Sequence, residues 1–132
     1  MLRGVIREQG GCYVSPTIFD NVAPEMAIAQ EEIFGPVLSV MAFYDEREAL
    51  SLANGTEYGL SATVWTRCIS RSKRLAHGIH AGTVTVRTSG KDQESGCMLS
   101  FEPRRSSGFG SEIGLRGLQS YSTLKLVRFS GD

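Results

Sequence analysis

Two side chains in the first third of the sequence could bind a ribose and a flat ring. Residues 30–37 read QEEIFGPV, so Glu32 and Phe34 stand two residues apart, directly before a Gly-Pro pair. A carboxylate has two acceptor oxygens, which suit two neighbouring hydroxyl groups of a sugar. An aromatic ring beside it gives an apolar wall for a flat heterocycle. The alternative is that Glu31 and Glu32 are exposed carboxylates before a strand and Phe34 is a core residue.

The cysteines and histidines show no catalytic or metal-binding pattern. Cys12, Cys68 and Cys97 are an odd number at wide spacing without a C-x-x-C motif, which disfavours zinc and thioredoxin-like chemistry. We expect the reduced thiols of a cytosolic protein. None of the cysteines has a neighbouring histidine or basic cluster that would clearly lower its pKa, as a nucleophile would require. His77 and His80 stand on one expected helix without further ligands. The sequence therefore predicts no catalytic residue and no metal.

Glycine and arginine are concentrated near residues 104–114. GFGSEIG at residues 108–114 is spaced like a phosphate-binding glycine loop, but it follows Arg104 and Arg105 rather than an apolar strand. We interpret it as a turn before a short helix. The two arginines are interpreted as a solvated or interface pair, with a free-standing anion site as the alternative.

Composition and charge exclude several classes of protein. Fourteen Lys and Arg balance fourteen Asp and Glu, which removes the bulk electrostatic argument for a nucleic-acid or membrane-surface partner. Residues 1–10 lack the apolar core of a signal peptide. The longest apolar run, residues 37–43, is far shorter than the roughly 20 residues that span a bilayer. We therefore expect a soluble, cytoplasmic protein.

Apolar runs of strand length recur along the chain and alternate with helical patterns. One helix begins after Asp45, which stands three residues before Glu48 as in a capping box, and ends before Gly55. Such alternation suits right-handed crossovers, so we expect a three-layer α/β fold. In it, a mostly parallel open sheet has flanking helices and central strands buried on both faces. Strands are expected over residues 13–19, 37–43, 61–65, 83–86 and 121–130, and further helices over residues 24–30, 70–79 and 113–120.

Several motifs together resemble the aldehyde dehydrogenase superfamily. Residues 30–37 resemble its E-E-I-F-G-P-V signature, and residues 53–60, ANGTEYGL, resemble its A-N-x-T-x-Y-G-L stretch. Order and spacing agree over most of the chain, but the resemblance covers only about the last quarter of a family enzyme. We therefore expect residues 1–132 to form a single partial domain, the C-terminal part of a catalytic domain. The other matching segments are residues 11–19, 81–84 and 117–125.

The resemblance implies roles for three residues. In the family, the second glutamate of the signature holds the nicotinamide ribose of NAD or NADP, and the phenylalanine packs by the nicotinamide. On this sequence these are Glu32 and Phe34, and Phe101 falls in the loop that borders the aldehyde pocket. The family's cysteine nucleophile, glutamate base and oxyanion-binding asparagine lie upstream of the matched segment. The resemblance thus implies oxidation of aldehydes to carboxylic acids, with this chain inactive by itself.

The sequence departs from the family pattern near its C-terminal landmarks. Arg87 stands where the family has an asparagine. The family's P-F-G-G-x-K-x-S-G run appears as SFEPRRSSG at residues 100–108, with Glu102 and Pro103 in place of two glycines. Since a positive φ is costly for glutamate and closed to proline, we expect this loop to follow a different path.

Three functions are compatible with these observations. The chain could be the C-terminal part of a dehydrogenase that works with a companion N-terminal chain. It could be a catalytically dead remnant that serves as an oligomerisation or interaction module, because a strand over residues 121–130 could pair across a homodimer. It could also be a free nucleotide-binding domain with measurable affinity for NAD.

Overall fold

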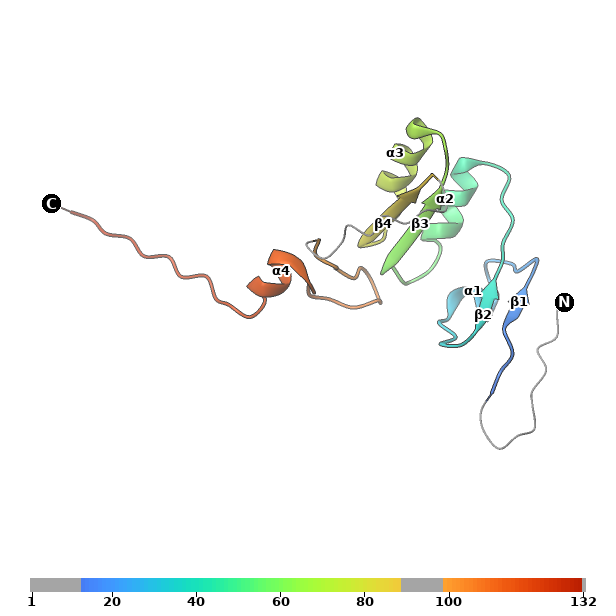
Figure 1. The fold of residues 1–132 in the computed structure, drawn as a ribbon, viewed down its shortest axis with the longest axis horizontal. Coiled ribbons are helices and arrows are strands. Elements are labelled where there is room, and N and C mark those ends of the chain that lie inside the picture. The colour runs from blue at the N-terminus through green and yellow to red at the C-terminus, as the bar shows by residue number, and fades with distance from the viewer. Residues whose placement is uncertain (1–12, 89–98, 132) are drawn as a thin grey trace. The chain divides into compact units, whose positions relative to one another are not determined.

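The computed structural model describes residues 13–88 and 99–131. Its helices and strands belong to two compact units, Met1–Glu57 and Tyr58–Asp132, and each unit is built on a parallel pair of strands (Figure 1). The expectation of an α/β fold with parallel strands is confirmed, and the strands form two small parallel sheets. No helix in the described part of the chain is long and apolar enough to cross a membrane.

The first unit holds the strands β1, Thr17–Phe19, and β2, Val37–Ser39, which pair in parallel with Thr17 opposite Val37. β1 is shorter than the predicted strand over residues 13–19, because Pro16 has no N–H to donate to a ladder. β2 is correspondingly shorter than the predicted 37–43, although the Val40 N–H still donates to the carbonyl of Phe19 at 2.8 Å. The length of β2 is therefore limited by its partner.

Two helices belong to the same unit. The short α1, Ala27–Gln30, is tied to β2 by the Ser39 hydroxyl, which donates to the carbonyl of Ile28 at 3.0 Å. The longer α2, Glu46–Asn54, begins as predicted: the Glu48 N–H donates to Asp45 Oδ1 at 2.8 Å. Glu48 Oε2 in turn accepts from the N–H of Tyr44 at 2.7 Å. The Glu48 side chain of the capping box therefore accepts from the residue before the N-cap, and not from the N-cap itself.

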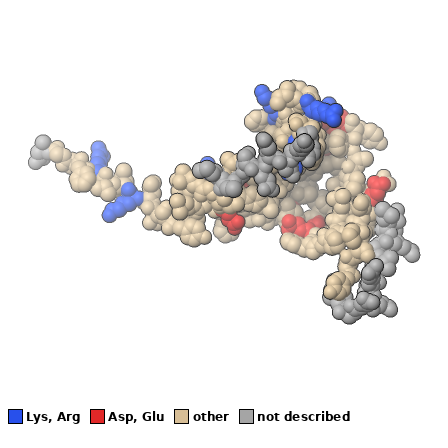
Figure 2. Space-filling model, in the orientation of Figure 1, with Lys and Arg blue, Asp and Glu red and all other residues tan. Residues whose placement is uncertain are grey.

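The second unit contains β3, Ser61–Trp65, α3, Ile69–Gly78, and β4, Thr83–Arg87. These elements match the predicted boundaries within one residue. β3 and β4 pair in parallel, with Ser61 opposite Thr83 and Trp65 opposite Arg87, and α3 packs against both strands. α3 exposes three basic residues on its solvent-facing side, and Figure 2 shows basic side chains over this part of the surface. They are Arg71, Lys73 and Arg74.

β3 and β4 are not buried on both faces, so that expectation is wrong for this chain. Val64 is buried, whereas its neighbours Thr63 and Trp65 are exposed, which is the alternation of a strand covered on one face. The single open sheet stays a prediction, because the strands pair here within two separate units. β2 pairs with β1, and β4 pairs with β3.

The C-terminal segment differs most from its prediction. The helix α4, Gly114–Gln119, lies within the predicted 113–120. The strand predicted over residues 121–130 is absent: residues 123–131 have no regular secondary structure, and Figure 1 shows an extended trace after α4. A strand requires a partner to accept and donate its backbone hydrogen bonds, and the described residues supply none for this segment.

Candidate functional site

The segment that contains Glu32 and Phe34 links α1 to β2. α1 ends where the N–H of Glu31 donates to the carbonyl of Ala27 at 2.8 Å. The chain then passes through Phe34 with a φ of 49°, a left-handed conformation that is unusual for a bulky residue. Such strain persists only where the surrounding structure fixes it, and it is concentrated at functional sites.

The exit from this segment is anchored to the sheet. The N–H of Val37 donates to the carbonyl of Gly35 at 2.8 Å, which makes a tight three-residue turn. The N–H of Thr17 at the start of β1 donates to the carbonyl of Pro36 at 2.9 Å. The Gly-Pro pair therefore fixes where the segment enters β2.

Both predicted cofactor-binding side chains are accessible. Glu32 is exposed and Phe34 is 92% exposed, so the alternative that Phe34 is a core residue is wrong for this chain. A small pocket nearby, lined by residues 16–18 and 35–38, contains neither side chain. The two side chains are available to a ligand, and their binding roles stay predictions.

Phe101, the residue predicted at the aldehyde pocket, is half-buried. Its backbone closes the loop over residues 101–112, called the returning loop below. Its N–H donates to the carbonyl of Glu112 at 2.8 Å, and the N–H of Glu112 donates back at 2.9 Å, which makes an antiparallel bridge. The preceding stretch 89–98 lies outside the described residues. The structure therefore gives Phe101 a structural role and leaves its contact with an aldehyde a prediction.

Glu102, one of the two residues that replace family glycines, makes an ion pair of its own. The Glu102 carboxylate accepts from Arg116 Nη1 at 2.7 Å on the surface. Neither Glu102 nor Pro103 adopts a positive φ. The left-handed conformations of this loop fall instead at Arg105, with φ 54°, and at Gly108.

One of the three cysteines, Cys68, lies within the described residues. Cys12 and Cys97 lie outside the described residues. Cys68 is exposed at the N-cap of α3, with its Sγ 3.1 Å from the Ser70 hydroxyl. That hydrogen bond, followed by one from the backbone of Arg71, lowers the pKa of the Cys68 thiol. The main cause of the lowered pKa of Cys68 is the hydroxyl of a serine two residues after it, and sequence reasoning, which looked for a histidine or a basic cluster, did not consider it.

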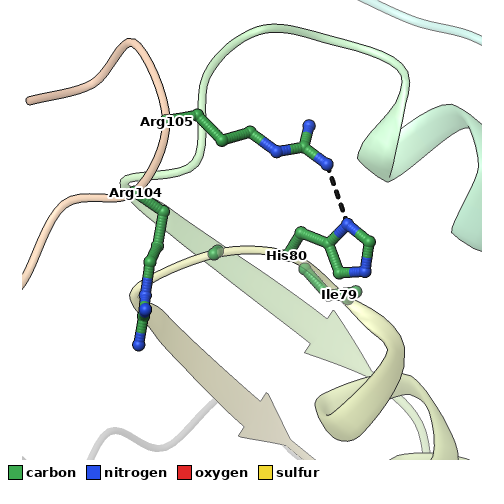
Figure 3. Close-up of a pocket in the computed structure, with 5 residues that line it drawn as sticks. Ile79, His80, Arg104 and Arg105 are labelled. Atoms are coloured by element: carbon green, nitrogen blue, oxygen red, sulfur yellow. Dashed lines mark hydrogen bonds between the residues drawn. The ribbon is translucent and has the colours of Figure 1, made fainter.

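A basic pocket is the site that sequence reasoning described least completely. It is lined by Ile79, His80 and Ala81, which precede β4, and by Arg104 and Arg105 (Figure 3). Arg105 Nη2 lies 2.8 Å from His80 Nδ1, although the two residues are 25 positions apart. The sequence pointed to the arginines but gave no sign of the histidine. Among the described residues, no group of three or more His, Cys, Asp or Glu could hold a metal ion.

The comparison with known proteins decides the family. Residues 2–127 match the aldehyde dehydrogenase family. The chain belongs to that family. Betaine aldehyde dehydrogenase of Agrobacterium fabrum is 42% identical over 120 residues, which are 91% of this chain and 24% of the relative. The 3,6-anhydro-alpha-L-galactose dehydrogenase of Streptomyces coelicolor is 41% identical over 119 residues, with 90% and 24% covered.

Solved aldehyde dehydrogenases share the fold. An indole-3-acetaldehyde dehydrogenase of P. syringae, in complex with NAD+ and IAA, is 44% identical, with a TM-score of 0.81 over 93% of this chain and 24% of that chain. An NAD-dependent aldehyde dehydrogenase from Sinorhizobium meliloti is 38% identical, with a TM-score of 0.83 over 94% and 24%. The chain thus spans about a quarter of the length of these relatives. The resemblance identified from its motifs is confirmed.

Proposed function

We propose that the chain is the C-terminal part of an NAD(P)-dependent aldehyde dehydrogenase, which oxidises aldehydes to carboxylic acids. The proposal is supported by one observation: residues 2–127 match the family while the chain covers only 24% of the betaine aldehyde dehydrogenase. In this proposal the nucleophilic cysteine, the general base and most of the cofactor surface come from the rest of the enzyme. The chain by itself has no turnover.

The residues present fit one part of the cofactor. Glu32 offers an exposed carboxylate whose oxygens accept from the two hydroxyls of a ribose, and Phe34 offers an exposed ring as a wall for a flat heterocycle. NAD or NADP, when bound, supplies the hydride acceptor of the reaction. The contribution of this chain is to orient the nicotinamide end, because the turn at Gly35 and Pro36 fixes where the segment joins β2.

The exposed apolar surface supports a place within a larger protein. Among the described hydrophobic residues, Val22 and Val64 are the buried ones, whereas Tyr44 is 99% and Phe109 100% exposed. Large apolar side chains that are exposed in this way indicate a surface that another part of a protein covers. In the whole enzyme, we propose that the β1–β2 and β3–β4 pairs belong to one mostly parallel sheet. Helices on both faces of that sheet complete the three layers of the catalytic domain.

Complementation tests this function. The chain is mixed with the N-terminal three quarters of the Agrobacterium fabrum betaine aldehyde dehydrogenase, and NAD+-dependent oxidation of betaine aldehyde is followed by NADH absorbance. We expect no turnover from either part alone and turnover from the mixture. A companion part with its nucleophilic cysteine replaced is the control and should give none. Turnover by the chain alone, or a stable but inactive complex, would contradict the proposal.

A second candidate function rests on the C-terminal segment, since Leu124, Leu126 and Phe129 are all more than nine-tenths exposed. In that case the chain is a catalytically dead remnant whose residues 121–130 pair with a second copy to form a homodimer. Sedimentation of the full chain and of a variant that ends at residue 120 separates the two. A dimer that becomes a monomer on truncation supports this function, and a monomer in both cases excludes it.

A further inference from the structure

The β3–β4 pair is covered on one face and open on the other. α3 packs against both strands, and the face that it covers is the one that carries the buried Val64 and the half-buried Val84. On the opposite face, the three side chains of β3 are exposed. They are Ser61, Thr63 and Trp65. Since parallel strands in α/β proteins are covered on both faces, the open face is a surface that a further segment covers.

Trp65 is the large apolar side chain of the open face, and it is 61% exposed. The guanidinium group of Arg87 lies over its ring, 5.6 Å from the ring centroid, in a cation–π contact. The two residues stand opposite each other in the ladder, and the N–H of Thr66 donates to the carbonyl of Arg87 at 3.0 Å. The ring is therefore held in place before a partner binds, which lowers the entropy cost of burying it.

The residues beside Trp65 allow close approach by another segment. Thr63 and Thr85 stand opposite each other on the same face, and both are exposed. Their side chains are short, so the indole ring extends further from the sheet than its neighbours do. A rigid tryptophan ring among short side chains has the features of an anchor at the centre of a protein interface.

The rest of the enzyme is the partner that fits this face. The match covers 24% of the Agrobacterium fabrum relative, which leaves about three quarters of that protein outside it. Parallel sheets are covered by helices, whose apolar stripe has residues spaced three and four apart. We propose that Trp65 is the anchor of the interface with the rest of the enzyme, inserted into the apolar stripe of a helix that lies on the open face of β3–β4. This inference rests on the proposed function and names the surface through which the two parts associate.

The single tryptophan of the chain allows a direct test. The whole chain is labelled with fluorotryptophan and mixed with the unlabelled N-terminal three quarters of the Agrobacterium fabrum betaine aldehyde dehydrogenase. Fluorine NMR in light and in heavy water gives the solvent isotope shift of the one resonance, which reports contact between the Trp65 ring and water. We expect a large isotope shift for the chain alone and a much smaller one in the complex.

Substitutions at position 65 separate association from chemistry. Trp65→Ala should raise the chain concentration that gives half-maximal turnover by roughly tenfold or more, and should leave the rate at saturating chain unchanged. Trp65→Phe keeps a flat apolar ring and should weaken association less. Lys73→Ala, at an exposed residue of α3, is the control and should change neither value. Because the indole ring is exposed, the circular dichroism spectrum of each variant should match that of the natural chain.

A photoreactive side chain identifies the segment that covers the face. With benzoylphenylalanine in place of Trp65, the crosslinked peptide of the companion part should carry apolar residues at the spacing of a helix. A crosslinked peptide with the alternating pattern of a strand would overturn the inference.

The other outcomes distinguish this inference from the proposed function. A complex that turns over while the isotope shift of Trp65 stays unchanged would overturn the inference alone. So would equal weakening by Trp65→Ala and Lys73→Ala. A resonance that moves as the chain alone is concentrated would show that a second copy covers the face, which overturns it as well. The absence of any complex would overturn the inference together with the proposed function.

Discussion

The carbonyl oxygen of Glu102 occupies the space that a side chain at Gly82 would need. A Cβ built on Gly82 overlaps that oxygen, and one built on Gly59 would lie 2.6 Å from the carbonyl oxygen of His80. The N–H of Gly82 donates to the carbonyl of Gly59 at 2.9 Å. The starts of β3 and β4 and the loop at residue 102 therefore meet at backbone contact distance.

Replacement of Gly82 by alanine should destabilise the second unit. The added methyl group meets backbone rather than a flexible side chain, so the loop at residue 102 must move. We expect the free energy of unfolding to fall by about 1–3 kcal/mol, as for other overpacked sites. Urea denaturation followed by the fluorescence of Trp65, the single tryptophan, measures the change.

Gly131→Ala is the matched control, because nothing lies within 4 Å of its built Cβ. This variant should leave the unfolding midpoint unchanged. Equal stability of the Gly82→Ala variant and the natural chain would mean that the returning loop does not pack against the start of β4.

The sequence predicted best those elements whose boundaries depend on interactions within the segment itself. The boundaries of β3, α3 and β4 follow from periodicity within each segment, and the structure matches them within one residue. Residues 123–131 have no regular secondary structure in the single chain. The strand predicted at residues 121–130 for pairing with another subunit stays a prediction, because strand formation depends on a partner that no local pattern specifies. The contact of His80 with Arg105 was missed for a related reason: 25 residues separate them, and only the path of the loop brings them together.

The N-cap of α2 gives a second prediction. Asp45 Oδ1 accepts from the N–H of Glu48 at 2.8 Å, which satisfies one of the free donors at the helix start. Asp45→Ala should lower the free energy of unfolding by about 0.5–2 kcal/mol. Asp45→Asn keeps an acceptor oxygen and should cost much less. Helix content by circular dichroism during urea unfolding measures both, and equal losses in the two variants would exclude the capping role.

Cys68 should react faster with alkylating agents than an ordinary cysteine. The thiolate is the reacting form, and the hydrogen bond from Ser70 lowers the pKa of this exposed thiol. The alkylation rate rises as pH increases through that pKa. In a Cys12→Ser, Cys97→Ser background, the midpoint of the rate–pH profile should therefore lie at lower pH in the folded chain than in urea.

Ser70→Ala should move that midpoint toward higher pH, because the largest cause of the lowered pKa is lost. Ser106→Ala, at an exposed serine of the returning loop, is the control and should leave the midpoint in place. Iodoacetamide labelling followed by mass spectrometry gives the rates. A midpoint that does not respond to Ser70→Ala would contradict the assigned cause.

The left-handed backbone at Phe34 predicts an unusual order of stabilities. With φ at 49°, alanine keeps the strain and loses the ring, whereas glycine relieves the strain. Because the ring is 92% exposed, its loss removes little packing. Phe34→Gly should therefore be at least as stable as Phe34→Ala in urea denaturation. The reverse order would mean that the natural chain does not hold residue 34 in this conformation.

The proposed role of Glu32 is best measured in the complemented enzyme. If its carboxylate accepts from the ribose hydroxyls, Glu32→Gln should raise KM for NAD+ by roughly 10- to 100-fold, the effect of weakening hydrogen bonds to a charged acceptor. The neighbouring Glu31→Gln removes the same charge from an exposed side chain and should change KM little. Steady-state rates at saturating betaine aldehyde give both values. Equal effects of the two substitutions would show that only the local negative charge matters, and no effect of either would remove Glu32 from the cofactor site.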